Sequence, residues 1–129
     1  MAGQVVHFEI PVDDPQRAQS FYRDAFGWRM EPMPEMSYTI VTTAAVDEQG
    51  MPAEPGAING GMLLRTEPVN NPVVVINVDS VDDALAQVER LGGSVLRAKT
   101  PVGDMGYSAY FIDTEGNTIG LWETSLQPI

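Results

Sequence analysis

The sequence contains no cysteine, which excludes disulfide bonds, thiolate metal ligands and cysteine nucleophiles. Histidine occurs once, at His7, so any imidazole chemistry of a single chain depends on that residue. Basic residues are also few: 7 Lys and Arg stand against 18 Asp and Glu, for a formal net charge of −11. Because this charge repels phosphate groups, we expect neither nucleic acid nor an anionic membrane surface as a partner.

Long hydrophobic runs are missing too: none approaches the roughly 20 residues needed to cross a bilayer. Residues 1–4 lack the basic start and apolar stretch of a signal peptide, so we expect a cytoplasmic protein. The chain has 129 residues, 43% hydrophobic and 19% charged, which is a globular mixture. This length suits a single domain, residues 1–129, with a core of its own.

The first half of the chain begins with a strand followed by a helix. Residues 4–12 are short, apolar and rich in β-branched side chains, which predicts a strand. Asp13 and Asp14 are suited to cap a helix, and Pro15 to its first turn. Apolar residues then recur three and four apart, ending at a C-cap glycine, Gly27; they are Ala18, Phe21, Tyr22, Ala25 and Phe26. The spacing predicts that Phe21, Tyr22 and Phe26 belong to the core.

The same pattern returns 66 positions later. Residues 73–78 predict a strand, Asp79 and Ser80 cap a helix, and residues 92–93 end it before a new strand at 94–96. A repeat of this period in so short a chain predicts two related modules, at about residues 1–66 and 72–129.

Further strands are predicted behind each helix, so that each module reads βαβββ. They cover residues 38–44, 60–65, 107–113 and 118–124, and the last two flank a hairpin turn at 114–117. Residues 101–107 are rich in glycine and predict either a plain connecting loop or a lid. The predicted class is α+β.

Three runs of sequence resemble the vicinal-oxygen-chelate superfamily, which includes glyoxalases, bleomycin-resistance proteins and extradiol dioxygenases. They are HFEIPVDD at 7–14, FYRDAFGW at 21–28 and DTEGNTIGLWE at 113–123. The resemblance extends over nearly the whole chain and is nearest to small bacterial glyoxalase-related proteins. It implies two βαβββ modules that form an open, cup-shaped β-barrel flanked by helices. It further implies a small-molecule ligand or substrate in the cup, and a homodimer.

The resemblance also implies a divalent metal, Fe, Mn, Ni or Zn, held by two strand positions from each module. Carried over by position, the ligands are His7 on the first strand and Glu123 on the last. The other two positions hold Val73 and Leu64, which have no donor atom. One His and one Glu fall short of the three protein ligands of a catalytic zinc or of the facial triad of iron enzymes. We therefore expect a degenerate site, with a metal held by His7 and Glu123 as the alternative to none.

His7 has three possible roles on this reading. It could form a structural hydrogen bond to Glu123, serve as a metal-free ligand-binding or acid–base group, or bind a metal. A His7–Glu123 pair could serve as a general acid–base couple near neutral pH, so both are candidate catalytic residues. Glu9 lies on the same strand face as His7 and is the alternative third metal ligand.

Other side chains are candidates for ligand contact because methionine adapts to varied apolar ligands and tyrosine offers a flat wall with a polar tip. With Glu9, these candidates are Tyr38, Met62, Met105 and Tyr107. Ordinary packing is the alternative for the methionines. By strand alternation, Trp122 packs under a helix if Glu123 points into the cup.

Three functions are consistent with the sequence, and whether the protein is an enzyme stays open. The preferred one is binding of a small molecule in the barrel cavity, with a degenerate metal site. The alternatives are a metal-dependent lyase or dioxygenase of glyoxalase type, and a metal-free acid–base isomerase or lyase.

Overall fold

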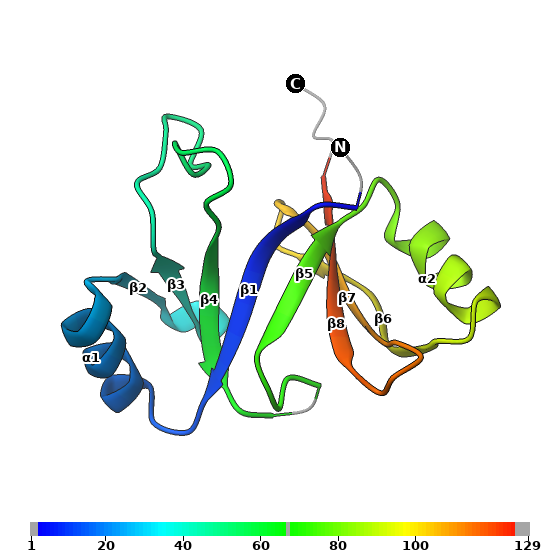
Figure 1. Cartoon of the computed structure of the whole chain (residues 1–129), viewed down its shortest axis with the longest axis horizontal. Helices are drawn as coiled ribbons and strands as arrows, with labels where there is room; N and C mark the ends of the chain where they lie inside the picture. Colours follow the sequence, from blue (N-terminus) through cyan, green and yellow to red (C-terminus); the bar gives the residue numbers. More distant parts are fainter. Residues whose placement is uncertain (1–2, 67, 126–129) are drawn as a thin grey trace. The chain divides into compact units, whose positions relative to one another are not determined.

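The computed structural model describes residues 3–66 and 68–125, and its chain forms the βαβββ pattern twice (Figure 1). The first repeat comprises β1 (Val5–Val12), α1 (Pro15–Phe26), β2 (Arg29–Met33), the short 3-10 helix η1 (Pro34–Met36), β3 (Tyr38–Thr42) and β4 (Asn59–Leu64). The second comprises β5 (Val73–Asn77), α2 (Val81–Arg90), β6 (Ser94–Val102), β7 (Gly106–Ile112) and β8 (Thr118–Thr124). The predicted α+β class with two βαβββ repeats is confirmed.

The chain divides into two compact units. The N-terminal unit is His7–Pro72, and the C-terminal unit combines the chain from Val73 onward with the described residues before His7. Those first residues join the second unit through the backbone: the Gly3 N–H donates to the Asn77 carbonyl at 2.6 Å, and the Asn77 N–H donates to the Gln4 carbonyl at 2.8 Å.

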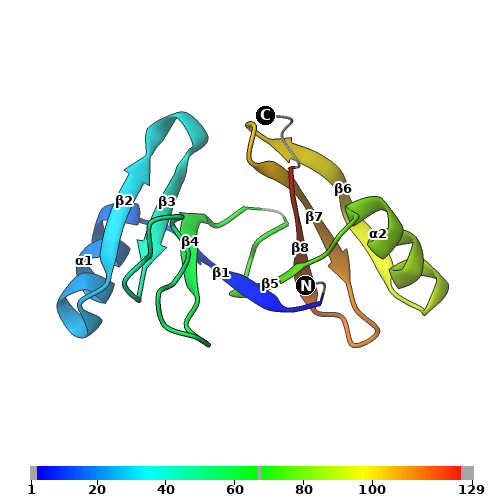
Figure 2. The ribbon, with the colours of Figure 1, turned by 90° about the horizontal axis from the view of Figure 1, so that it is seen from above.

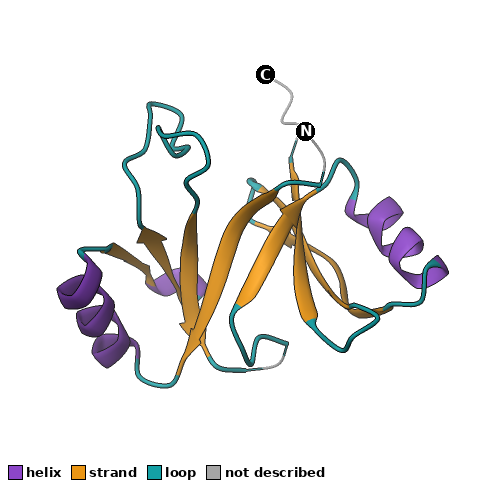
Figure 3. Cartoon of the chain, viewed as in Figure 1, coloured by secondary structure: helices purple, strands orange, loops and turns teal. Residues whose placement is uncertain are grey.

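The two units share one strand order. In the N-terminal unit the order is β2-β3-β4-β1, and in the C-terminal unit β6-β7-β8-β5, with only the β1–β4 and β5–β8 pairs parallel. Each unit carries its own helix beside its sheet (Figures 2 and 3). No helix in the described part of the chain is long and apolar enough to span a membrane.

Strand register confirms the internal repeat residue by residue. Pro11 pairs with Leu63, and Asn77 pairs with Trp122, so the 66-position shift that relates β1 to β5 matches a shift of 59 that relates β4 to β8. Positions of β1 and β4 therefore have defined counterparts in β5 and β8.

Both helices begin as the sequence predicts. The Asp14 carboxylate accepts the Arg17 N–H at 3.1 Å, Pro15 is the first helical residue, and Gly27 ends α1 with φ of 75°. In the second unit the Ser80 hydroxyl accepts the Asp83 N–H at 3.1 Å. Side chains that accept otherwise unpaired N–H groups fix where each helix starts.

A small core lies between α1 and its sheet. Val12, Val41 and Met62 are buried there, and partly buried side chains pack around them: Phe8, Ile10, Ala18, Tyr22, Trp28 and Met30. Phe8, Ile10 and Val12 thus face the helix, and their strand neighbours face the other side of the sheet.

The predicted core role of Phe21 and Phe26 is wrong. Their side chains are 60% and 64% exposed, whereas Tyr22 stacks on Trp28 with ring centroids 4.8 Å apart. The apolar stripe of α1 is wider than the surface that its sheet can cover.

The C-terminal unit has an equivalent core under α2. Val81, Leu85, Ala109 and Leu121 are buried in it, and partly buried residues surround them: Ile76, Val78, Ala84, Val95, Tyr107 and Phe111. Leu121 therefore marks the face of β8 that lies against the helix.

Two segments differ from their expected structure. β2 has no counterpart among the strands named from sequence, because two of its five residues are charged and one is proline. Residues 101–107, which could have been a lid, instead form the β6–β7 hairpin, in which the Met105 N–H donates to the Val102 carbonyl at 3.1 Å. The plain connecting turn is the observed alternative.

Candidate functional site

The face of the N-terminal sheet that points away from α1 carries a hydrogen-bonded group of three polar side chains. His7 and Glu9 lie two residues apart on β1, and Tyr38 begins β3. The Tyr38 hydroxyl lies 2.8 Å from Nε2 of His7 and donates to Oε2 of Glu9 at 3.0 Å. Glu9 is only 8% exposed, so its carboxylate is buried with a partner, as burial of a charge requires.

Gly61 on β4 makes room for this group. Its position pairs with Glu9 on one side and Ile40 on the other. A Cβ atom at Gly61 would overlap the hydroxyl group and ring of Tyr38. Sequence reasoning gave Gly61 no role in the site, although a glycine inside a strand often marks such a close approach.

Burial favours the neutral form of His7. Burial lowers the pKa of the imidazole below its ordinary value of 6.5, and the nearby Glu9 carboxylate offsets part of this effect. A neutral imidazole can accept a proton or a hydrogen bond. The three groups therefore combine a potential base, a phenol and a carboxylate on one patch.

The counterparts of His7 and Glu9 in the C-terminal unit are apolar. The repeat relates His7 to Val73, Glu9 to Val75 and Gly61 to Gly120. A Cβ atom at Gly120 would contact Val75 at 3.1 Å, and both Val73 and Tyr110 at 3.5 Å, so these residues share that face. The polar group of the N-terminal unit has no polar equivalent among these three positions.

Glu123 lies on the helix side of its sheet. It alternates with Trp122 and shares its strand face with the buried Leu121. Its Oε1 atom accepts the N–H of Val81, the first residue of α2, at 2.8 Å, and lies 3.9 Å from Nζ of Lys99. Trp122 is thus on the opposite face, and Glu123 binds a helix N-terminus. The pairing of Glu123 with His7 stays a prediction.

The remaining predicted contact residues are spread over different environments. Met62 is 1% exposed within the core under α1, on the face opposite His7. Tyr107 packs at the core under α2, and Nζ of Lys99 lies 4.3 Å from the centre of its ring. Met105 is 55% exposed in the β6–β7 turn. Only Glu9 and Tyr38 of this set lie beside His7.

Metal-binding side chains do not gather within either unit. Among residues 3–66 and 68–125, no three His, Asp or Glu side chains are grouped so that they could hold a metal ion. The counterparts of His7 and Glu123 are Val73 and Leu64, as predicted, and neither side chain has a donor atom.

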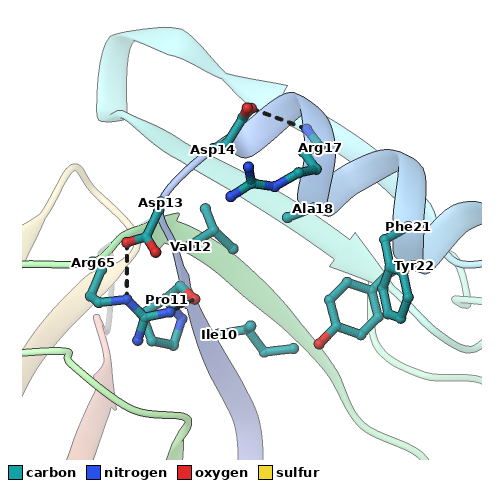
Figure 4. A pocket seen from close by; sticks show the side chains of 10 residues that line it. All are labelled: Ile10, Pro11, Val12, Asp13, Asp14, Arg17, Ala18, Phe21, Tyr22 and Arg65. Carbon is teal, nitrogen blue, oxygen red and sulfur yellow. Dashed lines mark hydrogen bonds and ion pairs between the residues drawn. The ribbon is translucent and has the colours of Figure 1, made fainter.

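A separate cavity of about 330 Å³ lies at the turn from β1 into α1 (Figure 4). Ile10, Phe21 and Tyr22 form its apolar wall, and Asp13 binds Arg65 at 3.0 Å at its edge. The wall does not include the His7 group. Sequence reasoning did not identify this cavity, which depends on the exposure of Phe21.

Comparison with known proteins places the chain in a family. A family model described as "Bleomycin resistance protein-like N-terminal" matches residues 4–44. A glyoxylase-like domain-containing protein of Didymella fabae is 33% identical over 121 residues, covering 90% of each chain. The Mycobacterium bovis protein CFP32, provisionally named a glyoxylase, is 27% identical over 122 residues; these are 91% of this chain but 44% of CFP32. The chain thus spans less than half the length of that relative.

Solved structures share the fold at low identity. The hypothetical protein BH1468 of Bacillus halodurans has a TM-score of 0.66 at 16% identity, covering 100% of this chain and 99% of its own. A Streptomyces coelicolor methylmalonyl-CoA epimerase, solved with 2-nitronate-propionyl-CoA, has a TM-score of 0.64 at 18% identity, covering 99% of this chain and 100% of its own. These structures show the fold alone, whereas the Didymella fabae relative, at 33% identity over 90% of each chain, shows the family. The chain belongs to the glyoxalase/bleomycin-resistance family of the vicinal-oxygen-chelate superfamily.

Proposed function

We propose that the chain binds a small organic molecule on the sheet face that carries His7, Glu9 and Tyr38. The observation that carries this proposal is the partly buried hydrogen-bonded group itself, which lies on the sheet face away from the α1 core and does not pack in that core. Binding sites typically combine a few fixed polar groups with apolar walls.

We further propose that this site works without a metal. Two of the four positions implied by the family, Val73 and Leu64, cannot coordinate a metal. The Tyr38 hydroxyl already engages the Nε2 atom of His7, and Glu123 is engaged by Val81 and Lys99. The residues present therefore do not fit a resident metal ion, and we derive no step through one.

Proton transfer is the second candidate function, and the neutral state of His7 favours it. Burial lowers the pKa of the imidazole, so the free base is present at neutral pH. His7 could then take a proton from a bound substrate, while Glu9 would stabilise the resulting imidazolium. In an isomerase of the metal-free kind, the imidazolium of His7 would then return that proton to a different atom of the substrate.

A ligand screen read by thermal stability tests the binding proposal. A molecule that binds only the folded chain raises the melting temperature, and the stabilisation grows with the logarithm of its concentration relative to its Kd. We expect compounds that stabilise the wild type to lose most of that effect in His7→Ala and Glu9→Gln. Glu115→Gln, in an exposed turn, is the matched control and should keep it. Ligands that stabilise all four proteins equally would contradict the proposed site.

A further inference from the structure

The Tyr38 hydroxyl has one proton and lies within hydrogen-bond distance of both Glu9 and His7. It donates to Oε2 of Glu9 at 3.0 Å and lies 2.8 Å from Nε2 of His7. An ionised carboxylate can only accept, and a phenol has a single O–H to give. The second hydrogen bond must then run from Nε2–H of His7 to the phenol oxygen. A neutral imidazole with its proton on Nε2 carries its lone pair on Nδ1.

The position of this hydroxyl depends on the glycine at position 61, which has no side chain to occupy the same space. Tyr38 pairs with Leu63, and Ile40 pairs with Gly61, so the phenol reaches back along the sheet to lie over Gly61. A methyl group at that position would occupy the space of the hydroxyl. Tyr38 on β3 can therefore take this position only because the neighbouring strand β4 has a glycine at position 61.

We propose that Tyr38, seated over Gly61, is a positioning residue that holds His7 as its Nε2–H tautomer and leaves Nδ1 as the acceptor. This inference deepens the proposed function and rests on it only for the use of Nδ1 by a ligand. The ligand atom that meets Nδ1 would be an N–H or O–H donor, as in an alcohol, an enol or an amide. A carboxylate would find no donor there.

Nitrogen NMR of the unliganded full chain, prepared without a histidine tag, tests the tautomer directly. His7 is the only histidine, so both ring-nitrogen signals belong to it, and their couplings to the two ring C–H protons distinguish Nδ1 from Nε2. Above the ordinary pKa of histidine, we expect a protonated, pyrrole-like Nε2 and an unprotonated, pyridine-like Nδ1. The opposite pattern would overturn the proposal, since Tyr38 would then donate to His7 and Glu9 would hold the other proton.

Two variants test whether Tyr38 is the cause. Tyr38→Phe keeps the ring but removes the hydroxyl, and Gly61→Ala displaces the hydroxyl without changing either partner. Both should move the two nitrogen shifts toward the average of the tautomers. Tyr22→Phe removes a phenol from the opposite face of the same unit and should leave them unchanged. If Gly61→Ala fails to fold, Tyr38→Phe decides alone, and an unchanged tautomer in that variant would overturn the proposal.

The outcome is separable from that of the ligand screen. An Nε2–H tautomer in a chain that binds no small molecule would remove the proposed function and leave the role of Tyr38 intact. An Nδ1–H tautomer in a chain that binds a small molecule through His7 would overturn the role of Tyr38 and leave the proposed function intact.

Discussion

His7 takes its chemistry from its surroundings rather than from its own sequence neighbours. The residue stood out in the sequence because it is the only histidine, and Glu9 followed from strand alternation. Tyr38 was predicted as a ligand contact, but its bond to His7 could not be, because the reach of a side chain from β3 depends on the gap at Gly61. Sequence patterns identify polar residues on a face; they do not give the hydrogen bonds between them.

The lowered pKa of His7 predicts an acid-dependent loss of stability. Burial holds the pKa below 6.5 in the folded chain, so the unfolded chain binds the proton more tightly. The contribution of neutral His7 is fully present above pH 6.5 and declines as the pH falls through the folded pKa.

Urea unfolding across this pH range measures the effect. The difference in unfolding free energy between wild type and His7→Gln should shrink as the pH is lowered from above 6.5, because glutamine does not titrate. A constant difference over the whole range would show that His7 titrates alike in both states.

At the scale of elements, Glu123 joins a strand to a helix. Its carboxylate accepts the first N–H of α2 and lies near Lys99, so it neutralises the positive end of the helix dipole. Position in the sequence alone suggested a site ligand, since the residue comes at the end of a family motif. Its orientation is set by the register of β7 and β8, which places Glu123 opposite Tyr107 on the helix side.

Removing this carboxylate should weaken the attachment of α2. We expect Glu123→Ala to lower the free energy of unfolding by about 1–2 kcal/mol, because the Val81 N–H loses its acceptor. Glu115→Ala, in the exposed hairpin turn, is the control and should change stability by less than about 0.5 kcal/mol. Equal effects of the two substitutions on urea denaturation would contradict the assigned contact.

Helix α1 illustrates what periodicity predicts and what it omits. Spacing placed Phe21, Tyr22 and Phe26 on one face, yet only Tyr22 packs against the core. The width of a buried stripe depends on the area of sheet beneath it, which the helix sequence does not contain. The caps, in contrast, are local: Gly27 was predicted as the C-cap, and of the predicted pair Asp13 and Asp14, Asp14 forms the N-cap.

Alanine substitutions along α1 should therefore have unequal effects. Tyr22→Ala removes a ring that stacks on Trp28 and should cost about 2–4 kcal/mol of stability. Phe26→Ala, at a side chain that is 64% exposed, should cost less than about 1 kcal/mol. Thermal or urea unfolding distinguishes the two, and a larger loss for Phe26 would mean that this side chain is covered in solution.

At the scale of the whole molecule, the two units repeat one fold but differ in the side chains at equivalent positions of their sheets. The βαβββ repeat was readable from the sequence because the caps, glycines and apolar positions recur at one period, and the strand registers match it. The two copies differ at the positions of the candidate site. The first unit has His7, Glu9 and Gly61 where the second unit has Val73, Val75 and Gly120. The fold is thus conserved between the halves, while the polar group belongs to one half alone.

Metal content tests the central claim, a binding site that works without a metal, most directly. The full chain, purified without a histidine tag or chelator, would be analysed for bound metal and then titrated with Fe(II), Mn(II), Ni(II) and Zn(II). We predict substoichiometric metal as purified and no saturable binding at micromolar concentrations, in the wild type and in His7→Ala alike. One metal ion per wild-type chain that is lost in His7→Ala would contradict the account and indicate a metalloenzyme with an incomplete protein shell.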